Sequence, residues 1–168
     1  MDDDSTKFNL LPYSNAQLTI LVVLRVAIGW HIFYEGLTKL LNPNWSSVGY
    51  LLDSKGIFAD FFYFLASDPG ILKVVDFLNV WGLLIIGLCL IIGLFEKFAS
   101  IGGILLLGLY YFSHPPFIGL DFEAPGEGSY LLVNKNLIEV LAIGINLYFP
   151  NSRLIGIDRL LYKMRNKK

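Results

Sequence analysis

Long apolar runs separated by short polar segments dominate this chain. A helix needs about 20 mostly apolar residues, within a range of roughly 17–25, to span a bilayer. Four segments reach that length, at about residues 17–41, 71–94, 97–113 and 133–150. The pattern therefore predicts four transmembrane helices.

The predicted boundaries carry residues that start or stop helices. The first run ends at 42–44, where a proline disfavours helix for the residue before it. Asp68 followed by Pro69 suits the N-cap and first helical position of the second run. Only Glu96 and Lys97 separate the second run from the third, which predicts an antiparallel hairpin.

Three further segments have patterns of their own. Residues 56–66 are rich in aromatic side chains but too short to cross, which is typical of a helix at the membrane interface. Residues 113–130 contain prolines, glycines and acids, as a long lid or binding loop does. From Arg153 onward the tail has one apolar helical face with basic residues around it, so it should lie on an anionic leaflet. The predicted fold is an all-α integral membrane protein in one domain, residues 1–168, with a four-helix transmembrane bundle, an extracytoplasmic interfacial helix and a C-terminal amphipathic helix.

The positive charges predict an orientation. With four crossings, both termini and the turn at 95–97 share one side. The basic residues on that side are Lys7, Lys97, Arg153, Arg159, Lys163, Arg165, Lys167 and Lys168, and those opposite are Lys39, Lys55, Lys73 and Lys135. We therefore expect a multi-pass protein of the inner (plasma) membrane with both termini cytoplasmic. The acidic start lacks the features of a signal peptide, so we expect the first span to be an uncleaved anchor.

Composition supports the membrane interpretation and limits the chemistry. Mean hydropathy is +0.59 and charged residues make up 16% of the chain, against about 25% in soluble domains. A net charge of −1 and the absence of a basic patch indicate no nucleic-acid partner. The single cysteine, Cys89, allows no internal disulfide or dithiol mechanism, and we interpret it as a packing residue.

The first predicted span is unusual because it carries four ionisable residues: Arg25, His31, Glu35 and Lys39. At 100° per residue they share roughly one third of the helix circumference, and His31 and Glu35 lie about 21 and 27 Å from the inner end. Charges at membrane depth are expensive and normally face a bundle interior or a wet cavity. These four side chains should therefore find partners on the other helices.

The other predicted spans supply such partners near their outer ends. These residues are Asp76, Asn79, Tyr111, His114, Lys135, Asn136 and Glu139. We expect a polar pocket in the outer half of the bundle, roofed by residues 42–70 and 113–132. Arg25 lies deepest and most needs an anionic partner, with Glu35 and Glu139 as candidates.

Simpler interpretations exist for several of these residues. Lys39, Lys73 and Lys135 lie near span ends and can extend to the headgroups. Asp76 is close enough to a helix start to act as a cap or dipole partner. A buried pair of Arg25 with an acid can serve helix packing alone.

Metal and haem sites are not indicated. The two histidines and the acids lack ligand spacing of the HxxxH kind, so no metal site is predicted. Bis-histidine haem ligation is disfavoured because His31 and His114 are expected at different depths. No flavin signature is present either.

Five stretches of the chain form a recognisable set: LRVAIGWHIFYEGLTKL, NPNWSSVGYL, VDFLNVWGLLIIGL, LYYFSHPP and VNKNLIE. Together they resemble the DoxX family of small four-helix membrane proteins. The family includes DoxD-like subunits of thiosulfate:quinone oxidoreductase, and other members are linked to thiol or sulfur redox stress at the membrane. The resemblance therefore implies a quinone-linked oxidoreductase subunit that acts on a small sulfur or thiol compound, often with a partner subunit.

The polar residues suit a quinone, which needs hydrogen-bond donors and nearby proton acceptors. We expect His31, Glu35 and Glu139 to be catalytic. The expected substrate-binding or quinone-binding residues are Arg25, Lys39, Asp76, Asn79, Tyr111, His114, Lys135 and Asn136. Without a flavin, haem or dithiol signature, the electron donor would react directly or through a partner.

Two other function classes stay open. The pocket can serve non-enzymatic binding or transport of a small polar molecule or lipid headgroup, although four spans without inverted repeats suit a transporter poorly. Alternatively the chain is a structural partner of another membrane protein. The partners that we expect are the lipid bilayer, a quinone or small polar ligand, and a partner subunit or further copies of the chain in a homo-oligomer.

Overall fold

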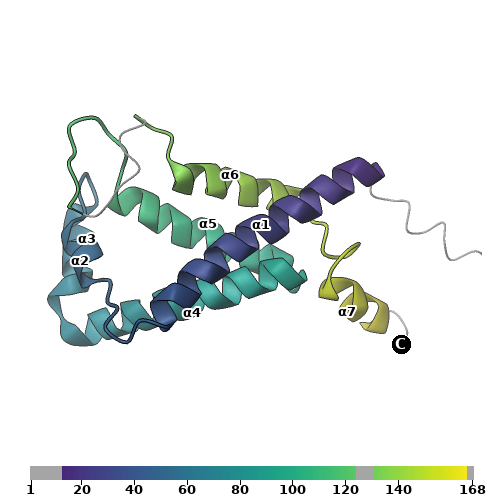
Figure 1. Cartoon of the computed structure of the whole chain (residues 1–168), viewed down its shortest axis with the longest axis horizontal. Helices are drawn as coiled ribbons and strands as arrows, with labels where there is room; N and C mark the ends of the chain where they lie inside the picture. The colour runs from purple at the N-terminus through teal and green to yellow at the C-terminus, as the bar shows by residue number, and fades with distance from the viewer. Residues whose placement is uncertain (1–12, 124–130, 166–168) are drawn as a thin grey trace, which may run out of the picture.

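The computed structural model describes residues 13–123 and 131–165, and within them the chain is helical, without strands (Figure 1). The helices are α1 Asn15–Leu40, α2 Val48–Leu52, α3 Ala59–Ser67, α4 Pro69–Ile92, α5 Glu96–Ser113, α6 Lys135–Tyr148 and α7 Ile157–Arg165. The all-α prediction is confirmed. The predictions for the acidic start, for residues 124–130 of the long loop and for the last three residues lie outside the described residues.

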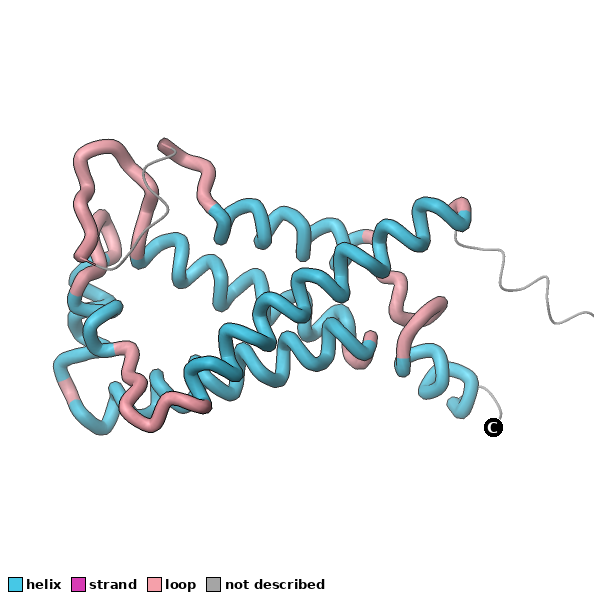
Figure 2. Tube along the Cα trace, viewed as in Figure 1, coloured by secondary structure: helices cyan, strands magenta, loops and turns pink. Residues whose placement is uncertain are grey.

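Four long helices form the body of the molecule. α1 packs on α4, α4 on α5, α5 on α6, and α6 returns to α1. Figure 2 shows them side by side, with α2 and α3 across one end and α7 at the other. We call the end with α2 and α3 the outer end and the end with α7 the inner end. The core between the four helices is aliphatic, with Ile28, Ile32, Leu83, Leu90, Leu107 and Ile143 buried.

The helix starts follow the capping residues in the sequence. Ser14 and Gln17 form a capping box that starts α1 at Asn15, two residues earlier than predicted. Asp68 accepts hydrogen bonds from the backbone N of Gly70 and Ile71 at 2.7 and 3.0 Å, which confirms it as the N-cap of α4.

Glycine allows α1 and α4 to touch through their backbones. A Cβ at Gly87 would lie 2.5 Å from the backbone N of Phe33, and one at Gly29 would lie 2.9 Å from that of Ile91. These distances are too short for any side chain, so the α1–α4 contact depends on both glycines.

Two of the four expected spans are supported by length and composition. Among the described helices, α1 and α4 are long and apolar enough to cross a membrane. α5 has 18 residues, and α6 has only 14, or about 21 Å of helix against the roughly 30 Å of a hydrocarbon core. The fourth predicted run at 133–150 is therefore helical over a shorter length than expected, because residues 133–134 and 149–150 lie outside the helix.

The predicted interfacial helix is also shorter than its aromatic run. Helix α3 begins at Ala59, and α2 precedes it as a separate turn of helix that the hydrophobic pattern did not show. The tail forms α7 as predicted, but from Ile157 onward.

Candidate functional site

Lys39 is held by three helices near the outer end. Its Nζ lies 3.1 Å from Oε1 of Glu35 and donates to Oδ1 of Asn79 and to the hydroxyl of Tyr110, both at 3.0 Å. The Tyr110 hydroxyl also donates to Asn79 at 3.0 Å. We call these four residues the Lys39 cluster. Because an ammonium has three N–H donors, its three partners use its full hydrogen-bonding capacity.

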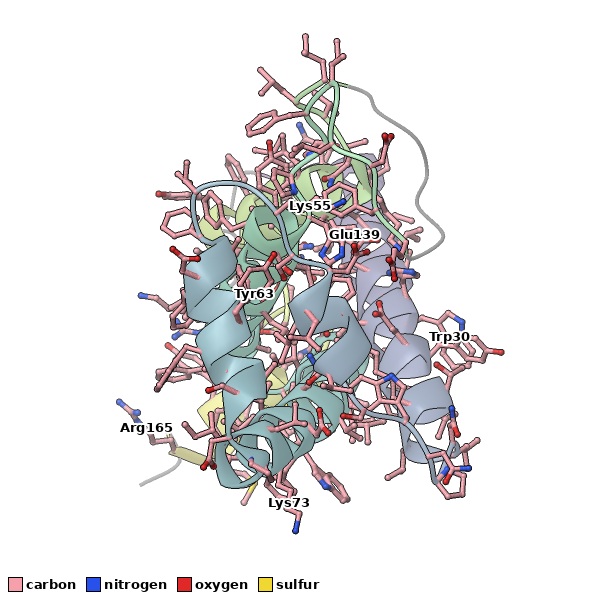
Figure 3. The ribbon with its side chains drawn as sticks, turned by 90° about the vertical axis from the view of Figure 1, so that its left-hand side faces the viewer. Trp30, Lys55, Tyr63, Lys73, Glu139 and Arg165 are labelled. Carbon is pink, nitrogen blue, oxygen red and sulfur yellow. The ribbon has the colours of Figure 1, made fainter. Side chains whose placement is uncertain are left out.

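His31 and Glu139 form a second contact, one to two turns deeper. Nδ1 of His31 on α1 lies 2.9 Å from Oε1 of Glu139 on α6. The imidazole is 40% exposed and the carboxylate 14% exposed, and Oε2 of Glu139 is buried without a hydrogen-bond partner. Figure 3 looks onto the outer end and shows Glu139 within the outline of the bundle, whereas Trp30 and Lys73 project from it.

The outer end is covered by α2 and the chain after α5. The Tyr50 ring stacks on His114, with centroids 3.9 Å apart, and meets Tyr110 edge-on at 5.9 Å. Nε2 of His114 lies 3.6 Å from Oδ2 of Asp53, which also accepts from the backbone N of Glu123 at 2.9 Å. We call Tyr50, Asp53 and His114 the roof stack. Burial lowers the pKa of His114, and Asp53, which raises it, offsets the effect only in part.

Asp76 fixes the covering segment to α4. Its Oδ2 accepts from Oγ of Ser46 at 2.8 Å, and its Oδ1 accepts from both the backbone N and the hydroxyl of Ser47. Asp76 therefore holds the segment between α1 and α2 against α4. It does not cap its own helix, which was one of the alternatives for this residue.

Arg25 is not part of the outer groups, which corrects the expected pairing with Glu35 or Glu139. Its Nη2 donates to the carbonyl of Ile155 at 2.8 Å, and its Nη1 lies 3.9 Å from Oε1 of Glu96. The reason is its position along the axis of α1, because six residues of helix place Arg25 about 9 Å closer to the inner end than His31.

Glu96 is the centre of a buried polar network at that end. Its Oε2 accepts from the backbone N of Asn151 and Ser152 at 2.9 and 2.7 Å. Asp158 accepts from the backbone N of Phe95 and Glu96 at 2.9 and 3.2 Å, which caps the start of α5. We call Arg25, Glu96, Asn151, Ser152 and Asp158 the inner network.

The inner network requires glycine at the end of α4. Gly93 has φ +66°, and a Cβ there would lie 3.0 Å from both Nη atoms of Arg25 and 2.9 Å from Cα of Gly156. The close approach of these backbones places Arg25 against the segment before α7.

The remaining predicted site residues lie at the outer edge. The Tyr111 hydroxyl donates to the carbonyl of Leu132 at 2.8 Å and so contacts the loop before α6, away from the Lys39 cluster. Lys135 is exposed and Asn136 half-buried in the first turn of α6, and Lys135 interacts electrostatically with Glu139 and Lys39. Within the described ranges, no three His, Cys, Asp or Glu side chains are grouped as a metal site would need.

One comparison with known proteins decides the family. The DoxX family model matches residues 20–115, which is more than half of the chain. The chain belongs to the DoxX family. No curated protein sequence and no solved structure matches it.

The match makes this DoxX protein a membrane protein, as its apolar helices also indicate. The matched segment contains α2 to α5 and α1 from residue 20 onward, and therefore His31, the Lys39 cluster, Asp76 and His114. Glu139 and the whole of α6 and α7 lie beyond it.

Sequence reasoning did not include several residues that the structure places in these groups: Tyr50, Asp53, Glu96, Asn151, Ser152 and Asp158. One signal for Glu96 was available, because it is a carboxylate at the inner end of the third run, and Arg25 is the ionisable residue of the first run that lies nearest to that end. Tyr110 and Tyr111 are adjacent in the sequence, so their side chains leave the helix about 100° apart. The sequence alone does not show which of the two faces the other polar groups.

Proposed function

We propose that this DoxX protein is a membrane-embedded subunit of a quinone-linked oxidoreductase. In this proposal it crosses the inner membrane four times with both termini cytoplasmic, and a small sulfur or thiol compound is oxidised at the outer half of the bundle. The observation that carries the proposal is the contact of His31 with Glu139 beneath the Lys39 cluster. The link of the family to quinone oxidoreductase functions supports it.

The residues of this contact fit a quinone head. A quinone accepts two electrons and two protons when it is reduced, so it needs hydrogen-bond donors and a source of protons beside its oxygens. His31 keeps 40% of its side chain exposed, so a molecule that approaches the contact of α1 with α6 can reach it. The second oxygen of Glu139 is buried without a partner, which leaves it available to hold a proton.

The proposed roles follow from these environments. His31 binds and orients the ligand and gives it a proton, and Glu139 stabilises the charged imidazole and exchanges protons with it. Lys135 and Asn136, in the turn of α6 above Glu139, bind the anionic or polar end of the sulfur substrate. Glu35 keeps Lys39 charged and in place.

Lys39, Asn79 and Asp76 hold the site in shape, because their polar atoms are engaged by protein partners. The roof stack and Tyr111 cover it from the outer side. Electrons come from the substrate directly or through a partner subunit.

Quinone binding tests the proposal. Purified full-length protein in detergent is titrated with a short-tailed ubiquinone or menaquinone analogue, and binding is followed by quenching of tryptophan fluorescence. We expect His31→Gln and Glu139→Gln to weaken binding at least tenfold, which corresponds to about 1.4 kcal/mol, the value of one good hydrogen bond.

Asp60→Asn is the matched control, because Asp60 is an exposed carboxylate of α3 at the same end. It should bind as the wild type does. Wild-type affinity in both site variants, with unchanged thermal unfolding, would remove the site assignment.

A structural role is the second candidate, and the saturated Lys39 cluster favours it. Three helices are joined there by groups that leave Lys39 no free donor. If the chain only stabilises another membrane protein, no quinone is bound, and Glu139→Gln leaves the partner's abundance unchanged.

A further inference from the structure

A cleft of about 890 Å³ opens at the inner end, remote from the outer groups. It lies between the start of α5, the end of α6 and α7. Its wall is largely apolar and includes Phe95, Phe98, Ile101, Leu147 and Leu161. This size is in the usual range for small-molecule sites.

Three cations stand at this cleft: Lys97, Arg153 and Arg165. All three are exposed, and the ion pairs of the described residues involve none of them. Figure 3 shows Arg165 projecting outward from α7. The two acids of the cleft, in contrast, are already bound by protein groups.

Those acids are Glu96 and Asp158. Glu96 is bound by two backbone N–H groups, and Asp158 by the start of α5 and the hydroxyl of Ser152 at 2.7 Å. The cleft has three cations against two acids, and Glu96 also faces Arg25, so the charge left for a ligand is positive. A partner must carry negative charge beside an apolar portion.

The cleft also lies at the level where a membrane should end. The candidate span α4 stops at Ile92, and the turn that follows leads directly to Phe95. From Ile101 the exposed apolar surface of α5 continues away from the cleft through Leu105, and that of α6 through Ile145 and Leu141. Such a surface suits acyl chains that run along the bundle.

Helix α7 is fixed in place before any ligand binds. The backbone N of Asp158 donates to the carbonyl of Gly93 at 2.9 Å, and the carboxylate of Asp158 accepts from Phe95. The wall that α7 contributes is thus held to the α4–α5 turn. A preformed site needs less ordering on binding.

We propose that this cleft binds one anionic phospholipid, with its phosphate between Arg153, Arg165 and Lys97 and its acyl chains along the apolar faces of α5 and α6. The site differs from a general attraction of the amphipathic tail to a charged leaflet, because it holds a single lipid in a defined place. It does not depend on the proposed redox function.

Lipid competition tests the proposal. Full-length protein in detergent binds a fluorescent phosphatidylglycerol, measured by anisotropy, and dioleoylphosphatidylglycerol, dioleoylphosphatidylcholine and glycerol phosphate are added as competitors. We expect phosphatidylglycerol to displace the probe at concentrations at least tenfold lower than phosphatidylcholine does. Glycerol phosphate, which lacks acyl chains, should not displace it.

Charge variants locate the site. Arg153→Gln with Arg165→Gln should weaken phosphatidylglycerol binding roughly 25-fold, since each cation contributes a factor of about five near an anionic headgroup. Lys55→Gln with Lys73→Gln removes the same charge at the outer end and should leave binding unchanged.

Four results would overturn the proposal. Three of them are equal competition by phosphatidylcholine, displacement by glycerol phosphate as effective as that by lipid, and equal losses in the two double variants. Retention of wild-type affinity after Arg153→Gln with Arg165→Gln would overturn it as well.

Discussion

Arg25 on α1 and Glu96 at the start of α5 face each other at the inner end with only 2% and 1% of their side chains exposed. Nη1 of the arginine lies 3.9 Å from Oε1 of the glutamate, and each group is also bound to the chain that follows α6. The two charges therefore join the first helix to the α4–α5 turn and to the segment before α7. This junction holds the inner end of the bundle together.

Removing one partner of this pair should be costly. We expect Glu96→Ala to lower the free energy of unfolding by about 3–5 kcal/mol, because it leaves a buried guanidinium without the carboxylate that faces it. Glu96→Gln should cost less, since its amide oxygen can still accept from Asn151 and Ser152. Urea or thermal unfolding in detergent measures both, and Lys163→Ala on the exposed face of α7 is the control. A Glu96→Ala protein as stable as this control would contradict a stabilising role for the pair.

The Lys39 cluster predicts different effects for two neighbouring tyrosines. Tyr110→Phe removes the hydroxyl that accepts from Lys39 and donates to Asn79, and unsatisfied buried groups cost about 1–3 kcal/mol. Tyr111→Phe removes only an exposed hydrogen bond to Leu132 and should change stability by less than about 0.5 kcal/mol. Equal unfolding midpoints for the two variants would show that the cluster adds nothing to stability.

The sequence predicted the outer polar groups because helix geometry relates them directly. Glu35 and Lys39 are four residues apart on one face of α1, and His31 is one turn deeper on the same face. Charge at membrane depth then requires partners, and Asn79 and Glu139 were among those expected. The N-cap at Asp68 was equally local and was predicted correctly.

Contacts that form because the chain folds back on itself were not predictable from helix geometry. Arg25 was expected to find an acid in the outer half, but its partners are Glu96 and the carbonyl of Ile155. That contact exists because the segment after α6 folds back onto the α4–α5 turn, and Gly93 and Gly156 allow the approach. A helical pattern carries no information about the path of such a segment.

The roof stack predicts a pH dependence of stability. Burial lowers the pKa of His114 in the folded protein below its value in the unfolded chain. The unfolded chain therefore binds the proton more tightly, so stability is lost as the pH falls from about 6.5, the unfolded value, toward the lower folded value. His114→Gln should remove this component.

Thermal unfolding between pH 8 and pH 5 measures the effect as a difference between wild type and His114→Gln. Asp53→Asn should enlarge it, because the Asp53 carboxylate raises the pKa of His114. If the thermal unfolding midpoint of the wild type rises relative to that of His114→Gln as the pH falls, the sign of the effect contradicts the prediction.

The proposal that ligand chemistry occurs where α1 meets α6 is tested most directly by photolabelling. A short-tailed azidoquinone is irradiated with the protein in proteoliposomes, and the labelled peptides are mapped by mass spectrometry. We predict label on α1 around His31 and on α6 around Glu139, reduced by excess unlabelled quinone and by Glu139→Gln. Label confined to other helices, or label that neither the competitor nor the substitution reduces, would contradict the account.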